Sequence, residues 1–236
     1  MIRSLIYVLW LYGSMAVIGI VYFPAALING KAAGDAARVW SHAALWGARV
    51  IIGLTVEIRG RENIPRGAAL IAGKHQAMLD TIMPFAVLDD PTVVLKKELL
   101  AMPIFGWFSQ RAGMIAVDRD AGAAAMMKML REAKAHAEAG QQVVIFPEGT
   151  RQEVGAPPDY QPGVAGLYAA MKTPCVPVAL NTGLYWPAHG VRRKPGNAVI
   201  EFLEPIPPGL PRKEFMATLQ ERIETASDRL AKVNAR

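Results

Sequence analysis

The first thirty residues carry almost no charge, and residues 5–28 form one run of 24 mostly apolar residues. As a helix rising 1.5 Å per residue, this run would span about 36 Å, enough to cross a hydrocarbon core of about 30 Å. A cleavable signal peptide is the alternative, but its apolar core is usually about 7–15 residues long. The pattern therefore predicts a retained membrane segment. Its interior glycines and Pro24 leave open a segment that enters only one leaflet.

The next stretch, residues 35–56, has a different pattern. Two arginines and a histidine fall within about 40° of one another on a helix, and apolar residues with two tryptophans fill most of the remaining surface. These residues are Arg38, His42, Arg49, Trp40 and Trp46. A narrow basic stripe with tryptophans is typical of an interfacial helix, and an ordinary core helix is the alternative.

After residue 56 the pattern becomes that of an α/β domain. Short apolar runs rich in β-branched residues predict seven strands. They cover residues 54–59, 68–72, 92–95, 114–117, 142–146, 176–181 and 198–203. Two amphipathic segments, residues 120–139 and about 213–233, predict helices, and the proline-containing residues 153–161 predict a loop.

Composition adds an expected partner to this organisation. Of the 236 residues, 52% are hydrophobic and only 19% are charged, against a charged share of about 25% in typical soluble domains. Lys plus Arg exceed Asp plus Glu by 26 to 20, a net charge of +6. This balance fits anionic partners such as lipid headgroups or phosphorylated substrates. No nucleic acid is expected, because the basic residues are dispersed among hydrophobic segments and no reader motif is present.

The first candidate for chemistry is His75 with Asp80, five positions apart and directly after an apolar run. Five helical residues are a rotation of about 140°, so the two side chains cannot share one helical face. They can meet if His75 lies in a strand-to-helix loop and Asp80 in the first helical turn. A neutral histidine held in this way can take a proton from an alcohol, and the carboxylate stabilises the imidazolium. Alone, the spacing is a weak signal.

Two anion-binding candidates follow along the chain. Arg119 comes just after a predicted strand, where its guanidinium could bind an anion, although an ion pair in solvent is the plainer alternative. In the run FPEGTR, residues 146–151, a buried strand ends at a proline, and an acid, a hydroxyl and an arginine follow within four positions. Such a turn can bind a phosphate, while its Glu148 holds either the loop or a substrate hydroxyl. A capped surface turn explains these polar groups poorly.

Four blocks occur in the order KHQAMLD, GMIAVDR, FPEGTR and VPVAL, with KKELLAMPIFGWF between the first two. This order resembles the signature of the glycerolipid acyltransferases of the 1-acylglycerol-3-phosphate acyltransferase type. The resemblance covers about residues 73–181, and FPEGTR is its most specific piece. It implies an α/β fold with a mixed central sheet flanked by helices. An N-terminal helical membrane anchor would occupy residues 1–56 and the acyltransferase domain residues 57–236.

The resemblance implies transfer of an acyl group from acyl-CoA or acyl carrier protein to the sn-2 hydroxyl of 1-acyl-sn-glycerol 3-phosphate, making phosphatidic acid. His75 would be the general base, oriented by Asp80, with no metal and no cofactor beyond the thioester co-substrate. No acyl-enzyme is implied, which agrees with the single Cys175 in an apolar run. The expected substrate-binding residues are Arg119, Glu148, Gly149, Thr150 and Arg151, with Lys97 and Lys96 as additional candidates.

Two residues depart from the family pattern and leave the acceptor open. The first block often begins with Asn and has Ser two residues after the histidine, where this chain has Lys74 and Ala77. Lys74 adds a positive charge beside the base, which Asp80 or a bound phosphate could balance. Another lysophospholipid, a lyso-aminolipid or glycerol 3-phosphate are the alternative acceptors.

Two other classes of protein remain as alternatives. One is a non-catalytic protein that binds anionic lipids, against which the presence of both His75 and Asp80 argues. The other is a metal-dependent phosphoester hydrolase, which would need more ligands than these two and Glu148 supply. Because acyl donors are cytosolic, the catalytic domain is expected on the cytoplasmic face of the inner membrane, in contact with membrane phospholipids. The excess of basic residues after the apolar segment favours this orientation.

Overall fold

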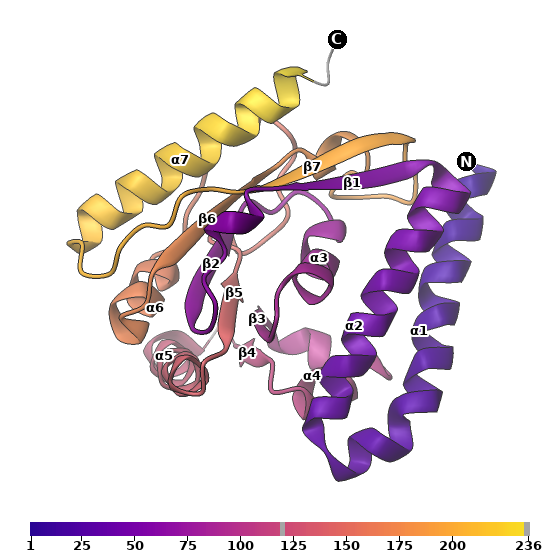
Figure 1. Cartoon of the computed structure of the whole chain (residues 1–236), viewed down its shortest axis with the longest axis horizontal. Coiled ribbons are helices and arrows are strands. Elements are labelled where there is room, and N and C mark those ends of the chain that lie inside the picture. The colour runs from indigo at the N-terminus through magenta and orange to yellow at the C-terminus, as the bar shows by residue number, and fades with distance from the viewer. Residues whose placement is uncertain (119–120, 234–236) are drawn as a thin grey trace.

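A computed structural model describes residues 1–118 and 121–233. Its strands are β1 (Leu54–Arg59), β2 (Ala69–Gly73), β3 (Pro91–Lys96), β4 (Ile115–Val117), β5 (Gln142–Ile145), β6 (Cys175–Leu180) and β7 (Gly196–Phe202). They form one sheet in the order β1-β7-β6-β2-β5-β3-β4 (Figure 1). All neighbouring pairs are parallel except β6 and β7, which are antiparallel. The seven predicted strands and the mixed sheet are confirmed.

Seven α-helices in the described part of the chain accompany the sheet. They are α1 (Ile2–Ile28), α2 (Gly30–Gly47), α3 (Leu79–Val87), α4 (Phe105–Arg111), α5 (Gly122–Glu138), α6 (Gly163–Met171) and α7 (Arg212–Val233). Helices α1 to α4 cover one face of the sheet, and α5 to α7 cover the other (Figure 1). The predicted helices at residues 120–139 and 213–233 correspond to α5 and α7.

The two cores follow from the alternation of side chains along a strand. In β2, Ile71 packs into the core shared with α1, α2 and α3, whereas its neighbours Leu70 and Ala72 pack into the core shared with α5, α6 and α7. Both faces of this central strand are buried, which explains why its sequence is a continuous apolar run without polar alternation.

The N-terminal helix α1 packs against the α/β part along one face and is exposed along the other. Tyr7 and Leu11 are fully buried and belong to the core that also contains Leu79 of α3. On the opposite face Leu9 and Ile20 are 74% and 72% exposed. The contacts run over nearly the whole length of α1. Each end of the helix also accepts hydrogen bonds from an arginine of the α/β part.

At the start of α1, the backbone N–H of Arg193 donates to Ser4 Oγ at 3.0 Å. Near its end, the Arg111 guanidinium donates to the carbonyl oxygens of Ala26 and Leu27 at 3.0 and 2.9 Å. The predicted anchor, residues 1–56, therefore shares one hydrophobic core with the rest of the chain. Its outer face remains apolar and exposed.

Helix α2 has features of both an interfacial helix and a core helix, the two interpretations that its sequence allowed. Trp40 is buried and its indole N–H donates to the Leu11 carbonyl at 3.0 Å, whereas Trp46 is 54% exposed. Arg38 does not belong to a free basic stripe, because its guanidinium donates to the carbonyl oxygens of Leu88 and Asp89. The helix also does not reach residue 56. A π-helical turn follows it, and Gly53 with φ of +79° ends that turn before β1.

Candidate active site

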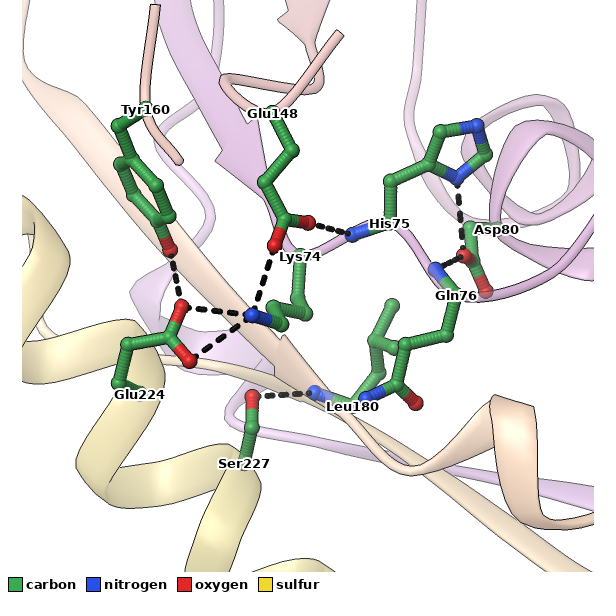
Figure 2. A network of polar contacts seen from close by, with 9 residues as sticks. All are labelled: Lys74, His75, Gln76, Asp80, Glu148, Tyr160, Leu180, Glu224 and Ser227. Carbon is green, nitrogen blue, oxygen red and sulfur yellow. Dashed lines mark hydrogen bonds and ion pairs between the residues drawn. The ribbon is translucent and has the colours of Figure 1, made fainter. Parts of the chain in front are cut away.

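His75 lies in the loop between β2 and α3, and Asp80 lies in the first turn of α3. Strand β2 is the middle strand of the sheet, and ligands in α/β folds bind beyond the carboxyl ends of such strands. His75 Nδ1 is 3.1 Å from Asp80 Oδ2. The loop-and-first-turn geometry predicted for this pair is therefore confirmed, and the other ring nitrogen of His75 points away from Asp80 (Figure 2).

Asp80 is almost completely buried, and both of its carboxylate oxygens accept hydrogen bonds. Oδ2 accepts hydrogen bonds from the backbone N–H groups of Gln76 and Ala77 at 2.6 and 2.7 Å. Oδ1 accepts one from the Thr182 hydroxyl at 2.6 Å. These donors hold the carboxylate in place facing the imidazole. With Nδ1–H donating to Asp80, the other ring nitrogen, Nε2, carries a lone pair that can accept a proton.

Sequence reasoning missed Thr182, and it assigned no role to the backbone around Ala77. Thr182 lies two residues beyond Leu180, the last residue of β6. A hydroxyl at the end of a fully buried strand, neighbouring the strand that precedes His75, is the signal that could have identified it. Ala77 contributes its backbone N–H, and its methyl side chain is fully buried.

Lys74 precedes His75, but its side chain does not face the imidazole. Its Nζ lies 2.7 Å from Glu148 Oε1 and 2.8 Å from both carboxylate oxygens of Glu224 on α7 (Figure 2). Burial alone would lower the pKa of Lys74, but these two carboxylates outweigh it and raise the pKa above the usual value. The sequence suggested Asp80 or a phosphate as groups that could balance Lys74, and the structure instead pairs it with Glu148 and Glu224.

Glu148 is completely buried, and its second oxygen, Oε2, accepts the backbone N–H of His75 at 3.0 Å. Burial raises the pKa of this carboxyl group, and Lys74 and the His75 N–H oppose the rise. Of the two roles considered for Glu148, holding the loop and holding a substrate hydroxyl, the geometry matches the first. Both of its oxygens face the histidine loop.

A cavity of about 950 Å³ opens beside His75. Its polar lining includes His75, Gly149, Thr150 and Arg151. Most of the remaining wall is apolar and comes from α1 to α5, with side chains such as Met15, Ile18, Trp40, Phe85, Phe105, Phe108 and Met129. The imidazole also stacks on Phe146, with the ring centroids 4.3 Å apart. The structure thus brings the FPEGTR turn and His75, which Asp80 holds, to the wall of one largely apolar cavity.

The remaining predicted binding residues differ in their positions. Lys96 lines the same cavity. Lys97 is not among the lining residues, and its ammonium group forms an ion pair with Asp118 Oδ2 at 2.9 Å with the side chain 62% exposed. Arg119 lies outside the described residues. Within residues 1–118 and 121–233, no three His, Cys, Asp or Glu side chains are grouped so that they could hold a metal ion.

Fold and site together define an α/β protein with a histidine–carboxylate pair beyond the end of its central strand, beside a largely apolar cavity. A family model described as Acyltransferase matches residues 55–181, which include the pair and the FPEGTR turn. The chain belongs to this Acyltransferase family.

Known relatives carry a more specific name. A 1-acyl-sn-glycerol-3-phosphate acyltransferase of Pseudomonas aeruginosa is 36% identical over 157 residues, 66% of this chain and 61% of that protein. One of Saccharomyces cerevisiae is 32% identical over 167 residues, 67% of this chain and 54% of that protein. The chain thus spans about half to three-fifths of the length of such relatives.

A solved structure shares the whole fold. The crystal structure of the 1-acyl-sn-glycerophosphate (LPA) acyltransferase PlsC from Thermotoga maritima matches with a TM-score of 0.80 and 21% identity. The match covers 100% of this chain and 98% of that one, so the N-terminal helices belong to the shared fold.

Proposed function

We propose that this protein transfers an acyl group from acyl-CoA or acyl carrier protein to the sn-2 hydroxyl of 1-acyl-sn-glycerol 3-phosphate, giving phosphatidic acid. The observation that carries the proposal is the position of His75. Its imidazole lines a largely apolar cavity, with Arg151 on the same lining. The names of the relatives support the same reaction.

In the proposed mechanism, Nε2 of His75 takes the proton of the acceptor hydroxyl as its oxygen attacks the thioester carbonyl. A C–O bond forms, the C–S bond breaks, and the imidazolium returns the proton to the leaving thiolate. Asp80 stabilises the imidazolium and keeps the ring in the required tautomer. No covalent acyl-enzyme is needed. Cys175 is fully buried in the core on the α5–α7 side, and burial raises the pKa of its thiol.

The cavity accounts for both ends of the lipid substrates. A volume of about 950 Å³ with mainly apolar walls suits a fatty acyl chain. On the same lining, Arg151, Thr150 and the backbone of the FPEGTR turn would bind the acceptor phosphate, with Lys96 as a further cation. Arg119 keeps the same proposed role. The reaction as written needs a thioester co-substrate and no metal or other cofactor.

An acyl-transfer assay with purified protein tests this proposal. Labelled acyl-CoA or acyl carrier protein is supplied with lysophosphatidic acid, and labelled phosphatidic acid is expected as the product. Parallel reactions contain a lyso-aminolipid, glycerol 3-phosphate or another lysophospholipid. Preference for one of these acceptors would correct the proposed substrate. Lipid binding without transfer, or phosphate release that requires metal, would contradict the proposed activity.

We further propose that α1 lies in the cytoplasmic leaflet of the inner membrane and does not cross the bilayer. In the described part of the chain, α1 is the one helix long and apolar enough to span a membrane. However, Arg111 and the backbone of Arg193 hold its two ends against the α/β part. A transmembrane α1 would draw these polar segments into the hydrocarbon, at a large cost in free energy.

Changing both Leu9 and Ile20 to glutamate is expected to lower binding to anionic phospholipid vesicles by about 10- to 100-fold, measured by flotation. The two side chains point to the same side of α1 and are 74% and 72% exposed. A charge costs about 2.5–3.5 kcal/mol at the bilayer centre and less near the interface. Because neither side chain is in the core, the Tm should change little. The control, Met127→Glu, changes a residue of α5 that is 67% exposed. Equal loss of binding in the control would contradict the leaflet proposal.

A further inference from the structure

The Lys74 ammonium group is the centre of a buried charge network next to the candidate base. The Lys74 side chain is 3% exposed and Glu148 is completely buried, whereas Glu224 is 21% exposed. The Tyr160 hydroxyl donates to Glu224 Oε1 at 2.8 Å. One lysine thus faces two carboxylates, and buried charges are tolerated only when they are paired in this way.

The network joins parts of the chain that are far apart in sequence (Figure 2). Lys74 belongs to the histidine loop after β2, Glu148 to the turn after β5, and Glu224 to α7. Glu148 is shared, because Oε1 contacts Lys74 and Oε2 accepts the N–H of His75. A continuous path of polar contacts therefore leads from α7 to the backbone of His75. Its outer member, Glu224, lies beyond residues 55–181, the segment that matches the family model.

We infer that Lys74 and Glu224 are a matched pair of positioning residues, which hold Glu148 so that it fixes both His75 and the FPEGTR turn. This inference rests on the proposed acyl transfer. Glu148 needs a cation because it is fully buried. Glu224, oriented by Tyr160, holds the lysine Nζ in place through two oxygens at 2.8 Å. The C-terminal helix thereby becomes part of the active site, although none of its residues lines the cavity beside His75.

The pairing predicts that a change of Lys74, a change of Glu224 and the two changes together lower the kcat of acyl transfer to different extents. Lys74→Asn leaves Glu148 and Glu224 without their cation, close to one another. Mutual repulsion would move Glu148, so the kcat of acyl transfer should fall by about 10-fold or more. Glu224→Gln leaves a neutral Lys74–Glu148 pair and should lower kcat by only about 2- to 3-fold.

The double variant, Lys74→Asn with Glu224→Gln, decides between positioning and independent effects. It retains a single carboxylate, Glu148, which two side-chain amides can now face as hydrogen-bond donors. Its kcat should exceed that of Lys74→Asn alone by about 5-fold. The KM for the acyl thioester should remain near the wild-type value in all three variants. Loss of structure alone would not produce such a rescue.

The matched control is Arg229→Gln, which removes an exposed ion pair between α7 and Glu201 of β7. It should keep the wild-type kcat, and the Tm of every variant is measured beside the activity. Wild-type kcat in Lys74→Asn, or a double variant no better than Lys74→Asn, would overturn the inference alone. Wild-type protein that transfers no acyl group would instead overturn the proposed function, and the inference with it.

Discussion

Replacing His75 with alanine is expected to lower the kcat of acyl transfer by about 10²- to 10⁴-fold, the usual contribution of a positioned general base. The variant loses the nitrogen that takes the proton of the hydroxyl, but the cavity and the FPEGTR turn that bind the substrates remain. The KM of both substrates should therefore change much less than kcat. Initial rates with labelled acyl thioester and lysophosphatidic acid measure both constants.

Two further variants make the result specific to the base. Asp80→Asn places an amide where the carboxylate accepts hydrogen bonds from the N–H groups of Gln76 and Ala77. The loop should then lose its fixed conformation and the histidine its required tautomer, so kcat should fall as well. His189→Ala, in an exposed loop, should behave like the wild type. If His75→Ala transferred acyl groups at the wild-type rate, another group would have to be the base.

Local patterns predicted most of the fold because the sheet is buried on both faces. Strands such as β2 are continuous apolar runs bounded by polar or glycine-containing turns. The hydrophobic pattern therefore predicts the bounds of such strands to within two residues. The contact between His75 and Asp80 was also predictable. It depends on one loop and one helical turn, so no distant part of the chain has to be known.

The partners that complete the site were not predictable from local patterns. Thr182 reaches Asp80 across 102 residues of chain, and Glu224 reaches Lys74 across 150. No periodicity specifies such pairings, since they follow from the strand order β6-β2-β5 and from the packing of α7.

Helix α1 illustrates a different limit. A 24-residue apolar run satisfies the length and hydropathy of a transmembrane helix whether lipid or protein covers it. Only the packing shows that Tyr7 and Leu11 are covered by protein, whereas Leu9 and Ile20 are exposed. Likewise, composition could not separate Lys96, which lines the cavity, from Lys97, which pairs with Asp118.

Arg151→Ala is expected to raise the KM for lysophosphatidic acid by about 10- to 100-fold, while the KM for the acyl thioester changes little. A hydrogen bond to a charged group contributes about 1.5–3 kcal/mol, and a guanidinium can donate two to one phosphate. Arg151 is exposed and lines the cavity, so water screens it until a phosphate binds, and its contribution should fall as ionic strength rises. The salt dependence of this KM should therefore be weaker in the variant than in the wild type.

Arg151→Lys separates charge from geometry, because lysine keeps the positive charge but lacks the two-pronged donor fork. Its KM for the phosphorylated acceptor should lie between those of the wild type and Arg151→Ala. Arg131→Ala, an exposed arginine on α5, is the control for the loss of one surface charge and should leave both KM values unchanged. An equal rise of both KM values in Arg151→Ala would show that the residue serves the turn as a whole and does not bind the acceptor phosphate. The phosphate site would then have to be sought at Lys96 and the other cations near the cavity.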